Sequence, residues 1–282
     1  MSNAPSAAPI SIHELQAIAK RVRAHIVKMV AAAQSGHPGG SLSAVEIGVS
    51  LFWNHLRCDP GNPDWPDRDR FILSKGHATP FYYSLLAERG FFSPELLGGF
   101  RTLGSPLQGH PSMGAVPGIE MSSGSLGQGL SFAIGQAIAG RLDRRDYRSW
   151  VLMGDGELNE GQVWEAAMAV PHFGLGDRII ALIDRNGIQN DGFADTIMQT
   201  HPAEMWRGFG WHVIECDGHD MAAVDQALAE AERPHDQPRA VVAYTVKGRG
   251  VSFMENNPGF HGKAPTPEQL ATAITEIEGG LL

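Results

Sequence analysis

The stretch that decides the fold is residues 154–192, "GDGELNEGQVWEAAMAVPHFGLGDRIIALIDRNGIQNDG". Asp155 follows the apolar run "SWVLM" and one glycine, and Asn186 follows a second apolar run, "RIIALI", and two further residues. The residues between Asp155 and Asn186 suffice for one crossover helix and one further strand. We therefore predict that the two apolar runs are adjacent parallel strands, and that Asp155 and Asn186 meet at their carboxyl edge.

The rest of the sequence continues this alternation of helices and strands. Ser11 and Glu14 form a capping-box pattern before a 3.6-residue apolar periodicity that extends to residue 33. Further helices are predicted over residues 42–56, 81–90, 126–143, 159–173 and 221–232, and strands over 71–73, 149–153, 178–183, 211–216 and 240–246. This order indicates an α/β fold, a parallel sheet with helices on both faces. Residues 98–124 are irregular and rich in glycine and proline, so we expect them to line a site.

Length and composition favour one soluble domain. The chain has 282 residues, and we expect a disordered tail over residues 1–11 followed by a single domain over residues 12–282. The formal net charge is -9 and lysine and arginine form no run, which argues against a nucleic acid partner. Two cysteines cannot form a disulfide framework, and the start of the chain lacks a signal-peptide pattern, so we expect a cytoplasmic protein. No apolar stretch is long enough to cross a membrane.

The predicted strand ends carry groups that suit a cation and a diphosphate. Asp155 and Asn186 supply a carboxylate and an amide oxygen, and the "NGI" loop can supply a backbone carbonyl, a donor set that a hard cation such as Mg²⁺ prefers. Gly156 lets the backbone approach a phosphate, and the helix that follows directs its N-terminus there. An acidic protein can thus hold a polyanion without lysines. A lone "GDG" is usually only a turn, but its placement here matches the signature of thiamine diphosphate enzymes.

From about residue 12 onward, the sequence resembles the transketolases. The resemblance is carried, in the family's order, by "SGHPGGSLS", "NPDWPDRDRFILSKGHA", "GHPS", "GSLGQGLSFAIG", "GDGELNEGQVWEAA", "DRNGIQNDG" and "VKGRGVSFMENNPGFHG". It implies an α/β thiamine diphosphate-binding domain with Mg²⁺, or Ca²⁺ or Mn²⁺ in its place. It also implies transfer of a two-carbon ketol unit between sugar phosphates.

The resemblance also implies individual site residues. The metal ligands would be Asp155, Asn186 and the carbonyl of Ile188, and the cofactor would contact Gly124, Leu126, Gly156, His77, Asn186 and His261. The catalytic histidines that surround the reacting carbon would be His37, His77, His110 and His261. One histidine beside a glycine is usually a turn or core residue, but four in their motifs are better explained as a site. We expect them to titrate near neutrality, as proton relays require.

Glu160 matches a glutamate that links paired active sites across the subunit interface in this family. The alternative is a carboxylate in the first turn of a helix, where the helix dipole favours it. Asn190 stands where many transketolases place an aliphatic side chain near the thiazolium ring. Because of this difference, the resemblance does not identify the donor sugar.

The resemblance covers only the first part of a transketolase. The pyrimidine-binding domain, whose glutamate activates the cofactor, and the arginines that hold the substrate phosphate have no match in this sequence. We therefore expect the N-terminal subunit of a split transketolase, paired as α2β2 with a second polypeptide that carries the pyrimidine and C-terminal domains. Two alternatives stay open: a related enzyme such as a deoxyxylulose phosphate synthase, and a non-catalytic cofactor-binding regulatory subunit. The histidines, "SGHPGG" and "KGHA" favour transketolase.

Overall fold

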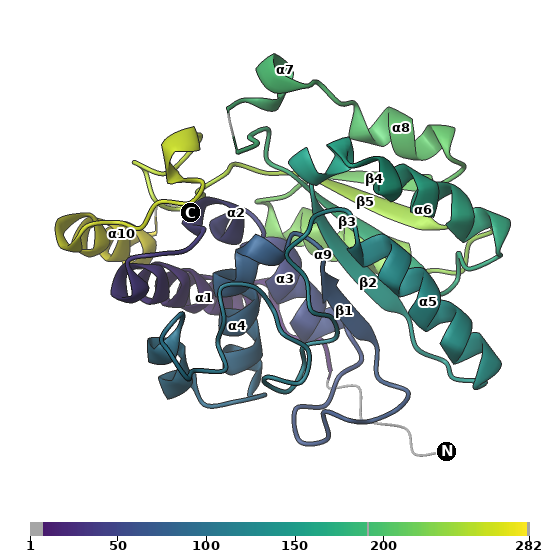
Figure 1. Cartoon of the computed structure of the whole chain (residues 1–282), viewed down its shortest axis with the longest axis horizontal. Coiled ribbons are helices and arrows are strands. Elements are labelled where there is room, and N and C mark those ends of the chain that lie inside the picture. Colours follow the sequence, from purple (N-terminus) through teal and green to yellow (C-terminus); the bar gives the residue numbers. More distant parts are fainter. Residues whose placement is uncertain (1–7, 191, 281–282) are drawn as a thin grey trace.

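The structure is a computed structural model, and it describes residues 8–190 and 192–280. Its centre is a parallel sheet of five strands in the order β1-β2-β3-β5-β4 (Figure 1). The strands are β1 (Arg70–Leu73), β2 (Ser149–Gly154), β3 (Ile179–Arg185), β4 (His212–Asp217) and β5 (Arg239–Tyr244). Each of them overlaps a predicted strand, and the predicted parallel sheet is confirmed.

Helices cover both faces of the sheet (Figure 1). One face shares a core with α1 (Ile12–Ala33), α3 (Val45–Ser50), α4 (Thr79–Arg89) and α9 (Met221–Glu232), and the other with α5 (Gly129–Leu142), α6 (Gly161–His172) and α8 (Pro202–Gly208). In β3, Ile180 and Leu182 join the first core, and Ile179, Ala181 and Ile183 join the second. Successive side chains of a strand point to opposite faces, so a continuous apolar run is buried on both sides.

The N-terminal helix begins where the sequence predicts. The hydroxyl of Ser11 accepts from the N–H of Glu14, and the Glu14 carboxylate accepts from the N–H of Ser11 at 2.9 Å, which is the predicted capping box. Just before it, the N–H of Ile10 donates to the Asn54 side chain at 2.9 Å. Residues 1–7 of the expected disordered tail lie outside the described residues.

One predicted helix differs from the structure. The helix expected over residues 42–56 is divided into α2 (Pro38–Leu42), α3 and a π-helical turn, Leu51–His55. Ser43 lies at the first break and donates to the buried carboxylate of Asp184 at 2.6 Å, a side-chain bond that competes with regular helix. The irregular stretch expected over residues 98–124 is confirmed from residue 101 onward, where residues 101–128, all of them described, form no helix or strand, whereas residues 98 and 99 belong to a 3-10 helix, Pro94–Gly99.

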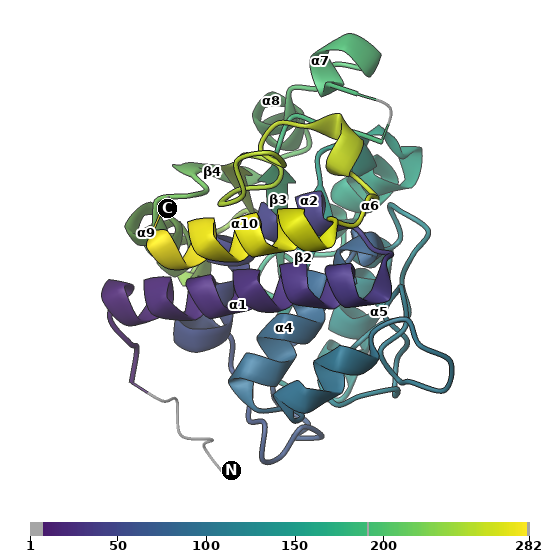
Figure 2. The same cartoon turned by 90° about the vertical axis from the view of Figure 1, so that its left-hand side faces the viewer.

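Three α-helices of the described chain have no counterpart in the prediction: α7 (Ala194–Ile197), α8 and α10 (Pro267–Gly279). α10 runs beside α1 on the surface (Figure 2). It begins with a capping box between Thr266 and Gln269, so the signal for it is present in "TPEQL". No helix in the described part of the chain combines the length and the apolar character that a membrane span requires.

His55 joins the π-helical turn to α9 and makes the fold sensitive to pH. Its Nδ1 lies 3.0 Å from the Glu232 carboxylate and its Nε2 lies 3.1 Å from that of Asp225. Burial opposes the charged imidazole, but the bonds and charges of Glu232 and Asp225 prevail and raise the pKa of His55 above its ordinary value of 6.5. Because the folded pKa is the higher one, this contribution to stability is full below the unfolded value and is lost as the pH rises through the folded value.

We therefore expect the free energy of unfolding to fall as the pH rises above 6.5, and the His55→Gln variant to lose this component of the slope. Urea unfolding at a series of pH values measures it. The exposed His201→Gln serves as the control and should keep the slope. Parallel curves for the wild type and His55→Gln would contradict the assignment.

Candidate active site

The loops that follow β2 and β3 lie side by side at the carboxyl edge of the sheet. The two strands pair in register up to Gly154 and Asp184. The N–H of Asp155 donates to the carbonyl of Asp184 at 3.3 Å, and the N–H of Gly187 donates to the Asp155 carboxylate at 2.6 Å. The predicted meeting of the Asp155 and Asn186 segments is therefore confirmed.

A cavity of about 310 Å³ opens beside these loops. It is lined by His37, Gly40, Lys75, His77, Gly124, Leu126, Gly154, Asp155, Gly156, Glu157, Asn186, Ile188, Gln189, Asn190, Lys247 and His261. These residues come from segments far apart in the sequence that end at one edge of the sheet. The structure thus gathers every residue predicted to contact the metal or the cofactor, and their roles as ligands stay predictions.

The predicted metal ligands are oxygens that attract positive charge. The Asp155 carboxylate accepts from Nη1 of Arg185 at 2.9 Å, and the Ile188 carbonyl accepts from Nζ of Lys247 at 2.8 Å. Oδ1 of Asn186 accepts from the N–H of Ile188 at 3.2 Å. A carboxylate, an amide oxygen and a backbone carbonyl are hard donors, so the residues present fit a divalent cation such as Mg²⁺.

Asp155 is the only carboxylate of this set and is almost fully buried. Burial and the neighbouring charge of Asp184 raise its pKa, against the opposing effects of the Gly187 N–H and Arg185. A nearby cation would favour its charged form. Among the described residues, no three histidines, cysteines or acids are grouped as a metal site.

Close backbone packing shapes the end of the cavity next to β2. A Cβ at Gly156 would lie 3.1 Å from Cγ of Gln189, so a side chain there would crowd the cavity wall. Glu157, the next residue, is buried and accepts from the N–H of Gly127 at 2.7 Å and from the Ser74 hydroxyl. Burial raises the pKa of Glu157. It holds the loops that form this wall.

Two buried lysines line the cavity, and sequence reasoning missed both. Lys75 donates to the carbonyl of Gly40 at 2.7 Å and forms an ion pair with Asp184. Lys247 is also buried, and burial, together with the charge of Lys75, lowers its pKa to about 8 despite the attraction of Asp155 and Asp184. The cavity therefore contains two cationic groups that the sequence interpretation of a polyanion site did not include. The signal lay in the quoted segments "SKGHA" and "VKGRG".

Three of the four predicted histidines form a compact group. The ring centroids of His37 and His77 are 5.2 Å apart, those of His37 and His261 are 5.4 Å apart, and those of His77 and His261 are 5.3 Å apart. Nδ1 of His37 is buried and has no hydrogen-bond partner in the described chain. His110 is exposed and lies beside Gly124, where a Cβ would lie 3.2 Å from its Cδ2. It is therefore at the rim, outside the lining residues.

His37, His77 and His261 do not titrate near neutrality in this chain, which corrects the prediction for these three. Burial, followed by the charge of Arg101, lowers the pKa of His37 to about 4, and burial, followed by Lys247, lowers that of His261 to about 3. Burial, followed by the charge of Lys75, lowers the pKa of His77 well below its ordinary value, and burial also lowers the pKa of His110. The imidazoles are therefore neutral hydrogen-bonding groups at neutral pH.

Glu160 lies outside the cavity, at the N-terminus of α6. Its side chain is exposed, and its carboxylate lies 3.5 Å from Nε2 of Gln162, which in turn donates to the carbonyl of Leu126 at 3.0 Å. An exposed position suits both of its sequence interpretations, a subunit contact and a helix-end carboxylate.

The fold and the site together define a class of protein. A parallel sheet carries, at its carboxyl edge, a cavity with hard oxygen donors, buried lysines and a group of neutral histidines. Such a domain is suited to bind a polar, anionic cofactor together with a cation.

The family model described as transketolase, thiamine diphosphate binding domain, matches residues 14–277. The chain therefore belongs to the transketolase family of transferases, in its thiamine diphosphate-binding domain. The resemblance inferred from the motifs is confirmed.

Relatives of two lengths match this chain. It is 37% identical to a protein of Phocaeicola vulgatus that is named as one of the subunits of an apulose-4-phosphate transketolase, over 95% of each chain. It is 40% identical to the 6-deoxy-6-sulfo-D-fructose transketolase subunit SqwG of Clostridium sp., over 94% of this chain and 96% of that one. The transketolase structure from Campylobacter jejuni superposes with a TM-score of 0.89 at 31% identity, over 95% of this chain and 43% of that one. The chain thus spans the relatives named as subunits and less than half of that longer transketolase.

Proposed function

We propose that this chain is the N-terminal subunit of a two-subunit transketolase. The complex transfers a two-carbon ketol unit from a ketose or ketose phosphate to an aldose or aldose phosphate, with thiamine diphosphate and Mg²⁺. The observation that carries the proposal is the cavity that gathers Asp155, Asn186, the Ile188 carbonyl and three histidines at one sheet edge. The near-complete match to two relatives named as subunits supports the division into two polypeptides.

Different lining residues would contact different parts of the cofactor. Asp155, Asn186 and the Ile188 carbonyl would hold Mg²⁺, or Ca²⁺ or Mn²⁺ in its place, and Gly156 would lie against the diphosphate. Gly124 and Leu126 would lie along the organic part of the cofactor. When bound, thiamine diphosphate supplies a nucleophilic carbon and an electron sink, chemistry that no side chain provides.

The chain's own contribution to the reaction lies in its neutral histidines. Nζ of Lys247 lies 2.8 Å from Nδ1 of His261, and an ammonium group can only donate. Nδ1 of His261 is therefore the acceptor, and the ring proton is on Nε2, where it can be donated to a sugar oxygen. His37 and His77, both neutral, can exchange hydrogen bonds with the hydroxyl and carbonyl groups of a ketose in the same space.

The partner we propose is a transketolase C-terminal subunit that carries the pyrimidine and C-terminal domains, assembled as α2β2. In the transketolase family, that region supplies the glutamate that activates the cofactor and the arginines that hold the substrate phosphate. The exposed Glu160 is our candidate for a contact across the subunit interface. Small sugar phosphates are the expected substrates.

His261→Ala is expected to lower turnover of the reconstituted complex by about 10²–10⁴-fold, because it removes a proton donor beside the reacting groups. His110→Ala should lower it less, because His110 lies at the rim. In both variants the affinity for thiamine diphosphate with Mg²⁺ should stay largely intact, because every predicted metal ligand remains and His261 is only one of several predicted cofactor contacts. Steady-state kinetics and calorimetric titration measure the two quantities.

The exposed His172→Ala is the matched control for these variants and should behave as the wild type. Unchanged turnover after both active-site substitutions would favour the alternative of a non-catalytic regulatory subunit.

The reaction is tested by purifying the chain together with its partner and supplying thiamine diphosphate, Mg²⁺, and a panel of donors and acceptors. The panel should include common ketose phosphates, apulose 4-phosphate and 6-deoxy-6-sulfo-D-fructose, the sugars in the names of two relatives. Product masses identify a two-carbon transfer. Condensation of pyruvate with release of CO₂, and no ketol transfer, would support the deoxyxylulose phosphate synthase alternative instead.

A further inference from the structure

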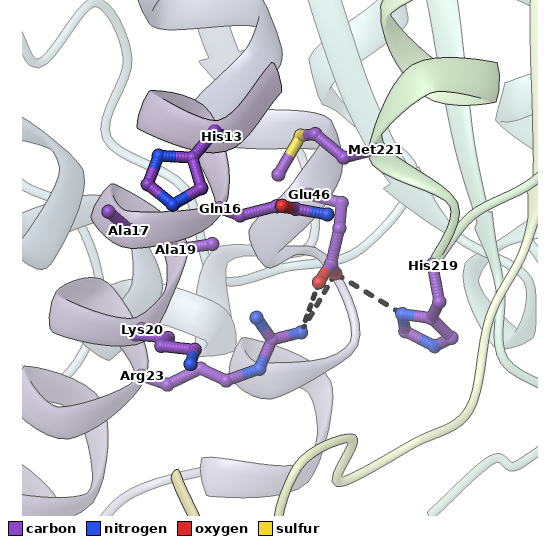
Figure 3. A pocket seen from close by; sticks show the side chains of 9 residues that line it. All are labelled: His13, Gln16, Ala17, Ala19, Lys20, Arg23, Glu46, His219 and Met221. Atoms are coloured by element: carbon purple, nitrogen blue, oxygen red, sulfur yellow. Dashed lines mark hydrogen bonds and ion pairs between the residues drawn. The ribbon is translucent and has the colours of Figure 1, made fainter. Parts of the chain in front are cut away.

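A second cavity, of about 250 Å³, lies between α1, α3 and the loop that joins β4 to α9 (Figure 3). Three of its lining residues bind one another: Nη2 of Arg23 donates to both Glu46 oxygens at 2.7 and 2.8 Å, and Nδ1 of His219 lies 3.2 Å from the same carboxylate. Their side chains are at most 10% exposed. We call Arg23, Glu46 and His219 the clamp cluster.

Arg23 and His219 of the clamp cluster also form hydrogen bonds to the backbone of residues 246–249. Nε of Arg23 donates to the carbonyl of Arg249 at 3.2 Å, and the N–H of Val246 donates to Nε2 of His219 at 2.6 Å. Because Nε2 is an acceptor, Nδ1 of His219 carries the ring proton and donates it to Glu46. The clamp cluster therefore binds the chain on both sides of Lys247.

The side chain of Lys247 leads from this segment into the active site. Its Nζ reaches the carbonyl of Ile188, a predicted metal ligand, and Nδ1 of His261, a predicted catalytic group. The segment 246–249 thus has the clamp cluster on one side and the cofactor cavity on the other. A small shift of this backbone would move the Lys247 ammonium relative to both groups.

We propose that Arg23, Glu46 and His219 are positioning residues of the active site. They fix the backbone of Val246 and Arg249 and thereby the place of Lys247 beside the metal and cofactor end of the cavity. The inference rests on the proposed function, since it assumes that the cavity binds thiamine diphosphate with a divalent cation.

His219 offers the cleanest test, because substituting Arg23 or Glu46 would leave a buried charge without its partner and could unfold the chain. A glutamine at position 219 can place its carbonyl oxygen where Nε2 was and accept from Val246. An asparagine can instead place its amide N–H where Nδ1 was and donate to Glu46, which leaves the Val246 N–H unpaired. The two variants thus separate the bond to the backbone from the bond to the cluster.

The experiment measures thiamine diphosphate affinity with Mg²⁺ by calorimetry on the complex of both subunits, and hydrogen exchange of the amides over residues 246–250. Positioning predicts that His219→Asn weakens the affinity by about 10–100-fold, as is typical of groups that support ligand-binding residues, and speeds exchange in this segment. His219→Gln should stay close to the wild type. His13→Asn, which lines the same cavity, is the control.

The opposite order, with His219→Gln impaired and His219→Asn normal, would overturn the proposal and assign His219 a purely structural bond to Glu46. Wild-type affinity and wild-type exchange in both variants would also overturn it. A wild-type complex that binds no thiamine diphosphate would refute the proposed function instead, and the exchange of residues 246–250 would still decide whether the clamp cluster fixes this segment.

Discussion

Replacing Asp155 with asparagine should weaken the binding of thiamine diphosphate and Mg²⁺ by more than about 100-fold, beyond the loss typical of groups that only support a metal ligand. Asp155 is the one charged oxygen donor of the predicted metal set, and its carboxylate is buried at the end of β2. Asparagine keeps the shape but not the charge. Calorimetric titration of the complex in the presence of Mg²⁺ measures the loss.

The fold should survive this substitution. Burial already disfavours the charged form of Asp155, so a neutral side chain relieves a cost while it loses the attraction of Arg185. Asp195→Asn is the matched control, because Asp195 lies 3.6 Å from the same Arg185 and is exposed, and exposed pairs contribute little. Tight, Mg²⁺-dependent binding by Asp155→Asn would remove this residue from the metal site.

The second large effect concerns the partner subunit. We expect the purified chain, supplied with thiamine diphosphate and Mg²⁺, to show no ketol transfer above background. Addition of the C-terminal subunit should raise the rate by at least about 10³-fold, the scale of a well-placed acid–base group. The reason is chemical: the residues in the cavity can hold the cofactor, but the activating glutamate of the family belongs to the pyrimidine domain.

A coupled assay of aldehyde product formation, run with increasing amounts of the second subunit, measures this dependence. A partner in which that glutamate is replaced by glutamine should assemble without restoring the rate. Full activity of the chain alone would refute the two-subunit proposal.

The sheet and the meeting of its two loops could be predicted from the sequence because both depend on local patterns. The runs before Asp155 and Asn186 consist mainly of apolar residues, as is typical of strands buried on both faces, and parallel strands end at one edge. The site residues were predicted from the motif resemblance. Gly124, Leu126 and Ile188 are among them, and the structure places all three in the lining of the cavity.

The remaining features depend on contacts between residues that are far apart in the sequence. Lys247 became part of the site only when the fold brought it to Ile188 and His261. The low pKa of His261 arises from burial and from the charge of that same lysine, and a reference value for isolated histidine cannot include either. The division of the helix at Ser43 likewise follows from a bond to Asp184, a distant residue in the chain.

The pairing of Gly154 with Asp184 also sets where the length of this chain can vary. Gly174, in the turn between α6 and β3, is exposed, and nothing lies within 4 Å of a Cβ placed there. A residue inserted at this turn would therefore extend a surface loop at the end of the β2–α6–β3 connection that is remote from the site. One residue added within β3 would instead turn every later side chain of that strand to the opposite face. Asn186 would then leave Asp155, so insertions are tolerable in the crossover turn and destructive in the strand.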